Sequence, residues 1–486
     1  MKISFTKLGA IGHAEVEIGN LTLICGENNT GKTYVTYGVY GFLAFWHSGF
    51  RFPLPDRLWG ELRNTGMAKV DLEPYVRDPA DVLRAACLEF QERLPRVFAA
   101  PKSRFSETQI VVDVPPRHAL FDEPFERSIT FGDAQLDVAK AKGSYEIVVT
   151  VVAGDRRPSF IPPSAIRRVG DAVKEALFRD SVSRPFVISS ERTGAAMFKG
   201  ELNPQSSRWR QGPDGGTDIL ERGSDESRAR VEDPDELDEE SRASLDDPDE
   251  FDVLGDVSTD YPLPIKANIQ FARKRESILT EEGFIWKAHR DVLAYLENVI
   301  GGEFELDDAG VFRFIPEGTN LKLSMDESSS CVRSLVDLRL YLGGVANQGA
   351  LLIIDEPEAN LHPRNQRRIA RMLPRLVRLG LRVLVTTHSD YIVKELNLLI
   401  LMNSSDERVR KLAEREKYLP QEALDPADVK LYVTRTEPAA DAPPGRPALS
   451  TNLVSVPVSA ENGIEIESFD REIESLNSIQ DELLWG

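Results

Sequence analysis

The chain has 486 residues, with 59 Lys and Arg against 79 Asp and Glu, so its formal net charge is −20. A chain this long is expected to form roughly two to four domain-sized pieces. Its acidity argues against a basic protein that coats nucleic acid but leaves room for a local basic groove. The three cysteines, Cys25, Cys87 and Cys331, are too far apart for a disulfide framework or a cysteine-cluster zinc site. We therefore expect a cytoplasmic protein, and neither a signal peptide nor an apolar run of about 18 residues predicts a membrane segment.

Most of the acidity is concentrated in one segment. Residues 213–256 contain 18 Asp and Glu and 4 Arg, which leaves a net charge of only −6 for the other 442 residues. The segment is also rich in Gly, Pro and Ser and has few apolar side chains to offset the entropy of ordering it. We interpret it as a disordered surface insertion. The alternative is a nucleic-acid mimic or a docking segment for a basic partner.

The N-terminal half predicts mixed α and β structure. Apolar runs, alternation and helical periodicity predict strands at 2–5, 14–18, 20–25, 144–154 and 185–189 and helices at 34–46, 80–93 and 164–178. Ser164 follows two prolines and is the predicted N-cap of the last of these helices.

The C-terminal half continues this pattern. It predicts helices at 276–299, 331–342, 363–379 and 469–484, buried strands at 350–354 and 382–386, strands at 430–434 and 453–458, and a hairpin of 311–316 with 320–325. No heptad pattern is long enough for a coiled-coil arm.

A phosphate-binding loop follows the strand at 20–25. The sequence Gly26-Glu-Asn-Asn-Thr-Gly-Lys-Thr33 fits G-x-x-x-x-G-K-[ST] between a strand and a helix. In such a loop the backbone N–H groups and the helix N-terminus converge on phosphate oxygens. We expect Lys32 to bridge the β- and γ-phosphates of ATP and the Thr33 hydroxyl to ligate Mg²⁺. The other predicted nucleotide-binding residues are Gly26, Asn28, Asn29, Thr30 and Gly31.

Two acids end the strand at 350–354. Asp355 is predicted to hold Mg²⁺, and Glu356 to act as general base for the attacking water. The strand at 382–386 leads to His388, whose imidazole we expect to contact the γ-phosphate. A histidine at a strand end is usually structural, but its place behind the Asp-Glu pair favours the catalytic interpretation.

Together, GENNTGKT, LLIIDEPEANLHP and LVTTHSDY, in this order and with a long insertion after the first, resemble ATP-binding-cassette-type (ABC-type) ATPases. The group that these motifs resemble includes RecF, the OLD-family nucleases and the ATPase subunits of bacterial anti-phage systems. The resemblance covers roughly residues 1–50, 183–198 and 320–402. It implies ATP and Mg²⁺ as cofactors and two heads that enclose nucleotide between them.

In that family the phosphate loop of one subunit faces a signature segment of the other. The resemblance assigns this role to the serine-rich turn Ser328, Ser329 and Ser330, whose hydroxyl and N–H groups would reach the γ-phosphate. The alternative is a plain serine N-cap of the helix that follows. Arg333 is a second candidate for that contact, and an ordinary surface arginine is the alternative. The Ser-Glu-Arg turn that ends at Arg192 follows a buried strand, as a similar Glu-Arg or Ser-Arg turn does in this group, and its role stays open.

The resemblance predicts an α/β fold: an ABC-type P-loop NTPase head, with a mostly parallel sheet and an antiparallel β part, split by a mixed α/β insertion. The expected divisions are the N-terminal half of the head (1–55), a mixed insertion (56–182), a head strand with the Ser-Glu-Arg turn (183–200), the acidic insertion (201–260), a helical segment (261–300), the C-terminal half of the head (301–402) and a C-terminal α/β extension (403–486).

An OLD-type nuclease would continue into a metal-dependent nuclease domain. Only 98 residues follow His388, and no Asp-x-Asp pair occurs among them, so we expect no intrinsic nuclease. The preferred hypothesis is an ATP-hydrolysing switch that forms a homodimer or higher oligomer. By resemblance, it would control a separate effector protein, such as a nuclease, in anti-phage defence.

Two other functions remain open from the sequence. Residues 364–382 carry seven arginines, which would suit a DNA-binding ATPase of the RecF kind, although arginines paired with nearby acids are the alternative. The other open function is that of a scaffold, in which the chain mainly sequesters an effector through the acidic segment.

Overall fold

The structure is a computed structural model. It describes residues 1–115, 117–131, 134–153, 161–197, 261–438, 449–464 and 478–482. The acidic segment at 213–256 and most of the predicted helix at 469–484 lie outside these residues, while residues 478–482 are helical.

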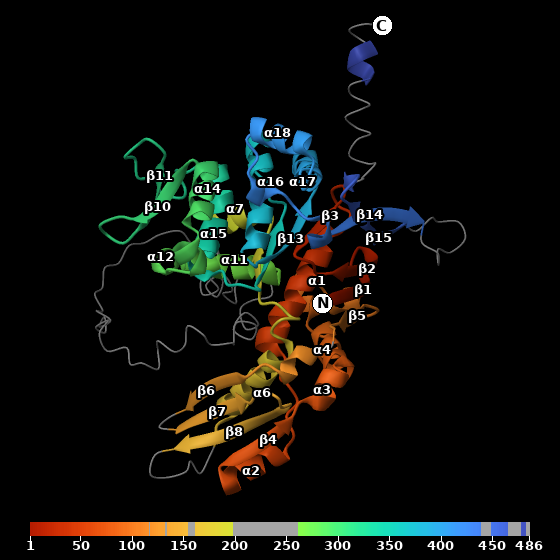
Figure 1. Cartoon of the computed structure of the whole chain (residues 1–486), viewed down its shortest axis with the longest axis vertical. Helices are drawn as coiled ribbons and strands as arrows, with labels where there is room; N and C mark the ends of the chain where they lie inside the picture. Colours follow the sequence, from red (N-terminus) through yellow and green to blue (C-terminus); the bar gives the residue numbers. More distant parts are fainter. Residues whose placement is uncertain are drawn as a thin grey trace, which may run out of the picture.

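A nine-stranded mixed sheet forms the centre of the molecule, in the order β5-β1-β2-β15-β14-β3-β13-β12-β9 (Figure 1). Its strands are β1 (Lys2–Leu8), β2 (Ile11–Glu17), β3 (Leu21–Cys25), β5 (Gln109–Asp113), β9 (Pro185–Ile188), β12 (Leu351–Asp355), β13 (Arg382–Thr387), β14 (Val429–Pro438) and β15 (Leu449–Val456). Neighbours from β14 to β9 are parallel, as is β15 with β2, whereas β1 pairs antiparallel with β2 and β5, and β14 with β15. The α/β fold class with a mostly parallel sheet and an antiparallel part is confirmed.

Both faces of the parallel strands are buried. In β12, Leu351 and Ile353 pack into one hydrophobic cluster with α1 (Lys32–Ala44), and Leu352 and Ile354 pack into another. The second cluster also contains side chains from α14 (Arg290–Ile300), α15 (Ser330–Leu340), α16 (Pro363–Arg378) and α17 (Asp390–Leu401). Burial on both faces explains why these strands are continuous apolar runs in the sequence.

The segment between α1 and β9 forms a second sheet, β4-β8-β7-β6, which is antiparallel throughout. Its strands are β4 (Met67–Asp71), β6 (Phe125–Phe131), β7 (Ala134–Lys140) and β8 (Glu146–Ala153). The helices of this segment are α2 (Arg57–Thr65), α3 (Glu73–Arg77), α4 (Ala80–Gln91), α5 (Leu94–Phe98) and α6 (Pro163–Phe178). Figure 1 shows this sheet at the lower end of the molecule, while β5 joins the edge of the central sheet.

The prediction of a single helix at 276–299 is wrong. The chain forms α12 (Arg275–Thr280), α13 (Phe284–Ala288) and α14 instead, after α11 (Leu263–Arg273). The break at Gly283 has a tertiary cause, since its N–H donates to the carbonyl oxygen of Gly343. A Cβ on Gly283 would lie 2.8 Å from that oxygen. The backbones at Gly283 and Gly343 therefore lie too close together for a residue with a side chain at position 283, and the helix is interrupted at this point.

Two other local predictions differ from the structure. The strand β11 (Phe312–Pro316) pairs with β10 (Gly302–Leu306), and the predicted partner at 320–325 contributes only a bridge between Leu323 and Phe314. Ser164 does not cap α6, because the helix already begins at Pro163 with Pro162 as N-cap. Proline suits the first helical position because its fixed φ is already helical and its missing N–H is not needed there.

The C-terminal strands do not pack beside the head as a separate pair. They lie inside the central sheet, where β14 pairs with β3 and β15 pairs with β2. The helix that precedes these strands, α18 (Glu407–Arg415), buries no side chain.

Candidate nucleotide site

The phosphate loop connects β3 to α1 through two glycines that need unusual backbone angles. Gly26 has φ 153° and Gly31 has φ 85°. A Cβ on Gly26 would lie 1.9 Å from Oγ1 of Thr434, and a Cβ on Gly31 would lie 2.6 Å from Cδ1 of Ile11. Only glycine therefore fits at the two ends of the loop.

Within the loop, Lys32 is buried and its Nζ donates to the carbonyl oxygens of Gly26 (2.9 Å) and Glu27 (2.7 Å). Thr30 donates to Glu27 O at 2.8 Å. Asn28 and Asn29 are exposed at the tip. The loop is thus folded around the ammonium group that we predict to contact phosphate, with its tip open to solvent.

Strand register brings the predicted metal ligands together. Asp355 pairs with Thr386 in β13, which in turn pairs with Ile24 at the end of β3. The Thr33 hydroxyl donates to Asp355 Oδ2 at 3.4 Å, and the Thr386 hydroxyl donates to Oδ1. Burial raises the pKa of Asp355 to about 6, because desolvation penalises the carboxylate.

A hydroxyl and a carboxylate are the oxygen ligands with which Mg²⁺ is usually held beside nucleotide phosphates. Within the described ranges, no group of three or more His, Cys, Asp or Glu side chains is arranged to hold a metal ion. The donor set therefore fits Mg²⁺ that keeps waters and phosphate oxygens among its ligands.

A second group surrounds the imidazole predicted to contact the γ-phosphate. Nδ1 of His388 lies 3.3 Å from Oε1 of Glu356 and 3.3 Å from Oε1 of Glu358. Glu356 has a left-handed backbone, φ 51°, and its N–H donates to Thr386 O at 3.1 Å. The predicted base and the predicted histidine thus adjoin, and Glu358 joins them although the sequence suggested no role for it.

Arg192 is the second residue to which the sequence assigned no role. It is 1% exposed, and burial lowers its pKa. Its guanidinium donates to the carbonyl oxygens of Ser334 (3.0 Å), Ser189 (3.0 Å), Asp355 (2.9 Å) and Glu356 (2.8 Å). It therefore joins the backbone after β12 to α15 and β9. The sequence signal for this contact was the place of Arg192 in the Ser-Glu-Arg turn that follows a buried strand.

Comparison with known proteins gives one family match. Residues 204–394 match a family described as "AAA domain, putative AbiEii toxin, Type IV TA system". That range contains β12, β13 and His388, and the phosphate loop lies outside it. The match covers less than half of the chain and shows a likeness of this part to an AAA domain. A search of curated proteins finds no match.

Solved structures similar to this chain include heads of Smc proteins. One is an Smc head bound to the C-winged helix domain of ScpA, with 11% identity, TM-score 0.34, and coverage of 94% of this chain and 97% of that chain. The head from Thermotoga maritima has 9% identity, TM-score 0.29, and coverage of 94% and 98%. The Pyrococcus furiosus head, with an extended coiled coil and a ScpA domain, has 10% identity, TM-score 0.30, and coverage of 99% and 98%.

The predicted signature serines lie at the start of α15. Ser329 is the N-cap and accepts from Val332 N at 3.3 Å, and the buried Ser328 donates to Ser324 O at 2.7 Å. The Arg333 guanidinium donates to carbonyl oxygens of the same turn, including Met325 at 3.2 Å. These bonds order the turn, and its contact with nucleotide stays a prediction.

The arginines at 364–382 are largely engaged in contacts within the chain. Arg367 and Arg371 both pair with the buried Glu395 at 2.5 Å, and Arg375 pairs with Glu422 at 2.6 Å. Others donate to main-chain or side-chain oxygens of Asn298, Ala423 and Asp180. This favours the interpretation as paired arginines over a DNA-contacting face.

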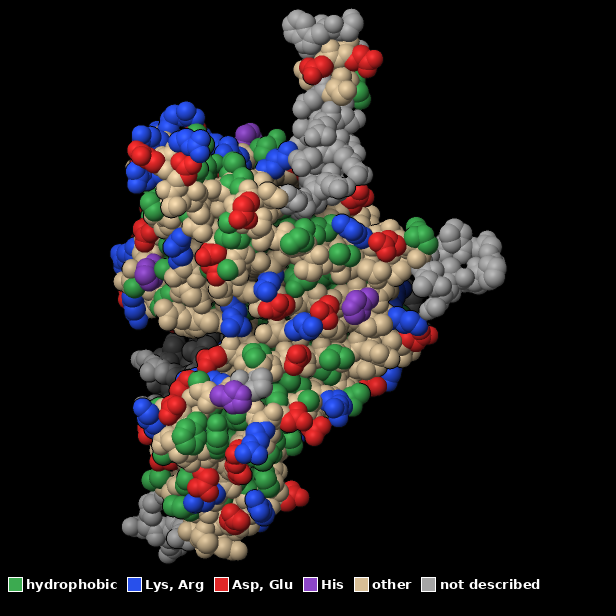
Figure 2. Space-filling view, turned by 45° about the vertical axis from the view of Figure 1, so that its right-hand side comes forward, with side chains coloured by type: hydrophobic (Ala, Val, Ile, Leu, Met, Phe, Trp, Pro, Cys, Tyr) green, Lys and Arg blue, Asp and Glu red, His purple; other side chains and the backbone are tan. Residues whose placement is uncertain are grey.

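The surface shows a similar mixture of charges. On the face in Figure 2, Lys and Arg mix with Asp and Glu, and the densest group of Lys and Arg lies at the upper end, where Figure 1 places α18. There Arg408 pairs with Asp406 and Lys411 with Glu407. Such exposed pairs are typical of a solvated helix.

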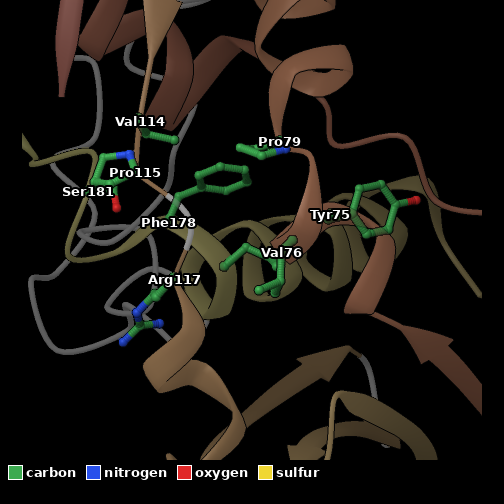
Figure 3. A pocket seen from close by; sticks show the side chains of 9 residues that line it. Tyr75, Val76, Pro79, Val114, Pro115, Arg117, Phe178 and Ser181 are labelled. Atoms are coloured by element: carbon green, nitrogen blue, oxygen red, sulfur yellow. The ribbon is translucent and has the colours of Figure 1, made fainter.

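A hollow elsewhere on the chain is lined by residues of the segment between α1 and β9 (Figure 3). They are Tyr75, Val76, Pro79, Val114, Pro115, Arg117, Leu177, Phe178 and Ser181. None of these residues belongs to the nucleotide site. No helix in the part of the chain that the structure covers is long and apolar enough to cross a membrane.

Proposed function

We propose that this chain is an Mg²⁺-dependent ATPase that acts as a molecular switch, in which two heads join around ATP and separate after hydrolysis. The observation that carries the proposal is the 3.4 Å contact between the Thr33 hydroxyl and Asp355, two residues 322 positions apart. A hydroxyl from the phosphate loop and a carboxylate from a neighbouring strand together match what a nucleotide-bound Mg²⁺ requires.

The other residues then have defined roles. Lys32 neutralises charge on the β- and γ-phosphates, Thr33 and Asp355 hold Mg²⁺, and Glu356 takes the proton of the attacking water. His388 contacts the γ-phosphate. The half-exposed positions of His388 (40%) and Glu356 (27%) support this division, because a group that meets substrate has to remain reachable.

Turnover measurements test the proposal. We expect wild type to hydrolyse ATP only with Mg²⁺, and Lys32→Ala and Glu356→Gln each to lower turnover about 100-fold or more. Glu356→Gln should still bind ATP, whereas Lys32→Ala should bind it weakly. Equal turnover in all three proteins would contradict the proposal.

We further propose that the switch controls a separate effector protein in anti-phage defence. The support is the motif resemblance, together with a matching family whose description names a toxin of a type IV system. A pull-down from native host lysate with Glu356→Gln and ATP should capture the effector, and Lys32→Ala should not. Capture that is identical with both variants would contradict control by nucleotide.

A further inference from the structure

Glu358 lies three residues after Asp355 in the turn that follows β12, and its side chain is 4% exposed. Its Oε1 accepts from the Thr387 hydroxyl at 2.8 Å and from the backbone N–H of His388 at 2.8 Å. The same oxygen lies 3.3 Å from Nδ1 of His388. A single carboxylate oxygen of Glu358 therefore contacts both the backbone N–H and the ring Nδ1 of His388.

The surroundings of the ring decide which nitrogen carries the proton. Nδ1 faces Oε1 of Glu356 and Oε1 of Glu358, each at 3.3 Å. An ionised carboxylate only accepts hydrogen bonds, so two such oxygens favour a proton on Nδ1. In the neutral ring Nε2, on the other side, then has the free lone pair.

The two carboxylates are not equivalent. The Glu356 side chain is 27% exposed, whereas Glu358 is fixed by two donors. Glu358 Oε2 is buried and accepts no hydrogen bond from any residue that the structure describes. A buried oxygen without a donor costs about 1–3 kcal/mol. A neutral glutamine would accept the same two hydrogen bonds at lower desolvation cost. The turn can therefore keep its two hydrogen bonds without a negative charge here, whereas an uncharged oxygen attracts the Nδ1 proton less strongly.

We propose that Glu358 is a positioning residue for His388. It selects the tautomer protonated on Nδ1 and fixes the ring, so that the lone pair of Nε2 faces the nucleotide and can accept a hydrogen bond from the water that attacks the terminal phosphate. This inference rests on the proposed ATPase function. In Glu358→Gln an uncharged amide oxygen takes the place of the carboxylate oxygen that faces Nδ1, so the preference for a proton on Nδ1 weakens, while the backbone bonds of the turn can persist.

A double-mutant cycle tests the inference through ATP turnover. Glu358→Gln in the wild-type background should lower kcat about 10- to 100-fold, as is usual when a partner that orients a histidine is lost. In the His388→Gln background the same change should lower kcat less than about 2-fold, because its target is gone. An equal effect in both backgrounds, or none in wild type, would overturn the proposal.

A matched control separates positioning from general damage. Glu395 is also buried, and its carboxylate pairs with Arg367 and Arg371, neither of which belongs to the candidate nucleotide site. Glu395→Gln should lower the melting temperature and change kcat by the same factor in both backgrounds. Should Glu358→Gln fail to fold, Thr387→Val removes one donor of Glu358, and its effect on kcat should likewise vanish in His388→Gln.

A spectroscopic measurement keeps this inference distinct from the proposed function. The chain has 6 histidines, so the imidazole ¹⁵N signals of His388 are assignable by their loss in His388→Gln. Wild type should show the proton on Nδ1, and Glu358→Gln should shift the population towards Nε2. If wild type hydrolyses no ATP, the proposed function fails and the spectrum alone decides, with identical tautomers in both proteins overturning the role of Glu358.

Discussion

Arg192 Nη2 donates to the carbonyl oxygen of Glu356 at 2.8 Å, across 164 positions of the chain. Glu356 has a left-handed backbone at this point, a conformation that non-glycine residues rarely adopt without support. The same guanidinium bonds to Ser334 O in α15, the helix that begins at the predicted signature turn. Arg192 therefore links the proposed base to the helix that would face a second head.

Substitution of Arg192 should impair both stability and catalysis. Arg192→Lys offers one nitrogen where the guanidinium uses three, so buried carbonyl oxygens lose their donors. We expect a loss of about 2–4 kcal/mol in the free energy of unfolding and at least a 10-fold lower kcat, because Glu356 is displaced. Urea denaturation and ATP turnover check this. Unchanged turnover in a destabilised but folded variant would show that Arg192 does not position the base.

The C-terminal strand β14 should contribute to nucleotide affinity. Thr434 Oγ1 lies 2.7 Å from Oγ1 of Thr30 in the phosphate loop. Thr434→Val removes that hydrogen bond at nearly constant volume, so Mg-ATP should bind about 3- to 10-fold more weakly. Thr436→Val is the matched control, since its hydroxyl contacts Thr451 at 3.0 Å and not the loop. Calorimetric titration measures both, and equal affinities for the two variants would contradict the prediction.

Acid should destabilise the chain through His47, near the end of α1. Burial, with the charges of Arg184 and Lys174, lowers the pKa of His47 to about 3. The unfolded imidazole titrates near 6.5, so the unfolded state binds a proton first as pH falls. This contribution to stability is complete above pH 6.5 and is lost progressively towards pH 3.

Between pH 7.5 and 5 the loss that comes from His47 alone should be about 2 kcal/mol, at about 1.4 kcal/mol per pH unit below 6.5. The difference between wild type and His47→Gln isolates it, because Asp355, whose pKa is raised to about 6, stabilises the folded state when it is protonated over the same range. Urea unfolding at both pH values measures it. His47→Gln should lose less stability over this range than wild type, and the exposed His118→Gln should behave like wild type. A His47→Gln variant as acid-sensitive as wild type would rule out this origin.

ATP should join two heads when hydrolysis is blocked. Glu356→Gln retains the predicted contacts to phosphate and Mg²⁺ but lacks the base, so its ATP-bound state should persist. Light scattering should report about twice the monomer mass with Mg-ATP, and the monomer mass for Lys32→Ala/Glu356→Gln. Ser329→Ala should weaken the dimer if the signature turn contacts nucleotide of the other head. A mass that ATP does not change would refute the switch.

The elements that the sequence determined are those whose signals are local. The run LTLIC before the phosphate loop, LLIID before Glu356 and RVLVTT before His388 are buried on both faces, so their hydrophobicity is continuous and their ends are marked by polar residues. Parallel strands end at one edge, and this alone brings Thr33 and Asp355 together. The motif residues could therefore be predicted to share a site without knowledge of the rest of the fold.

Only the tertiary structure decided which distant segments complete that site. Strand pairing is non-local, and nothing within the sequence of β14 indicates that it pairs with β3. Thr434 in β14 and Cys25 in β3 are 409 positions apart in the chain. The hairpin partner of β11 and the break at Gly283 depend likewise on contacts made elsewhere in the chain. Arg192 and Glu358 act through backbone carbonyls and a buried carboxylate oxygen. Such contacts follow from the three-dimensional path of the chain, which residue spacing does not specify.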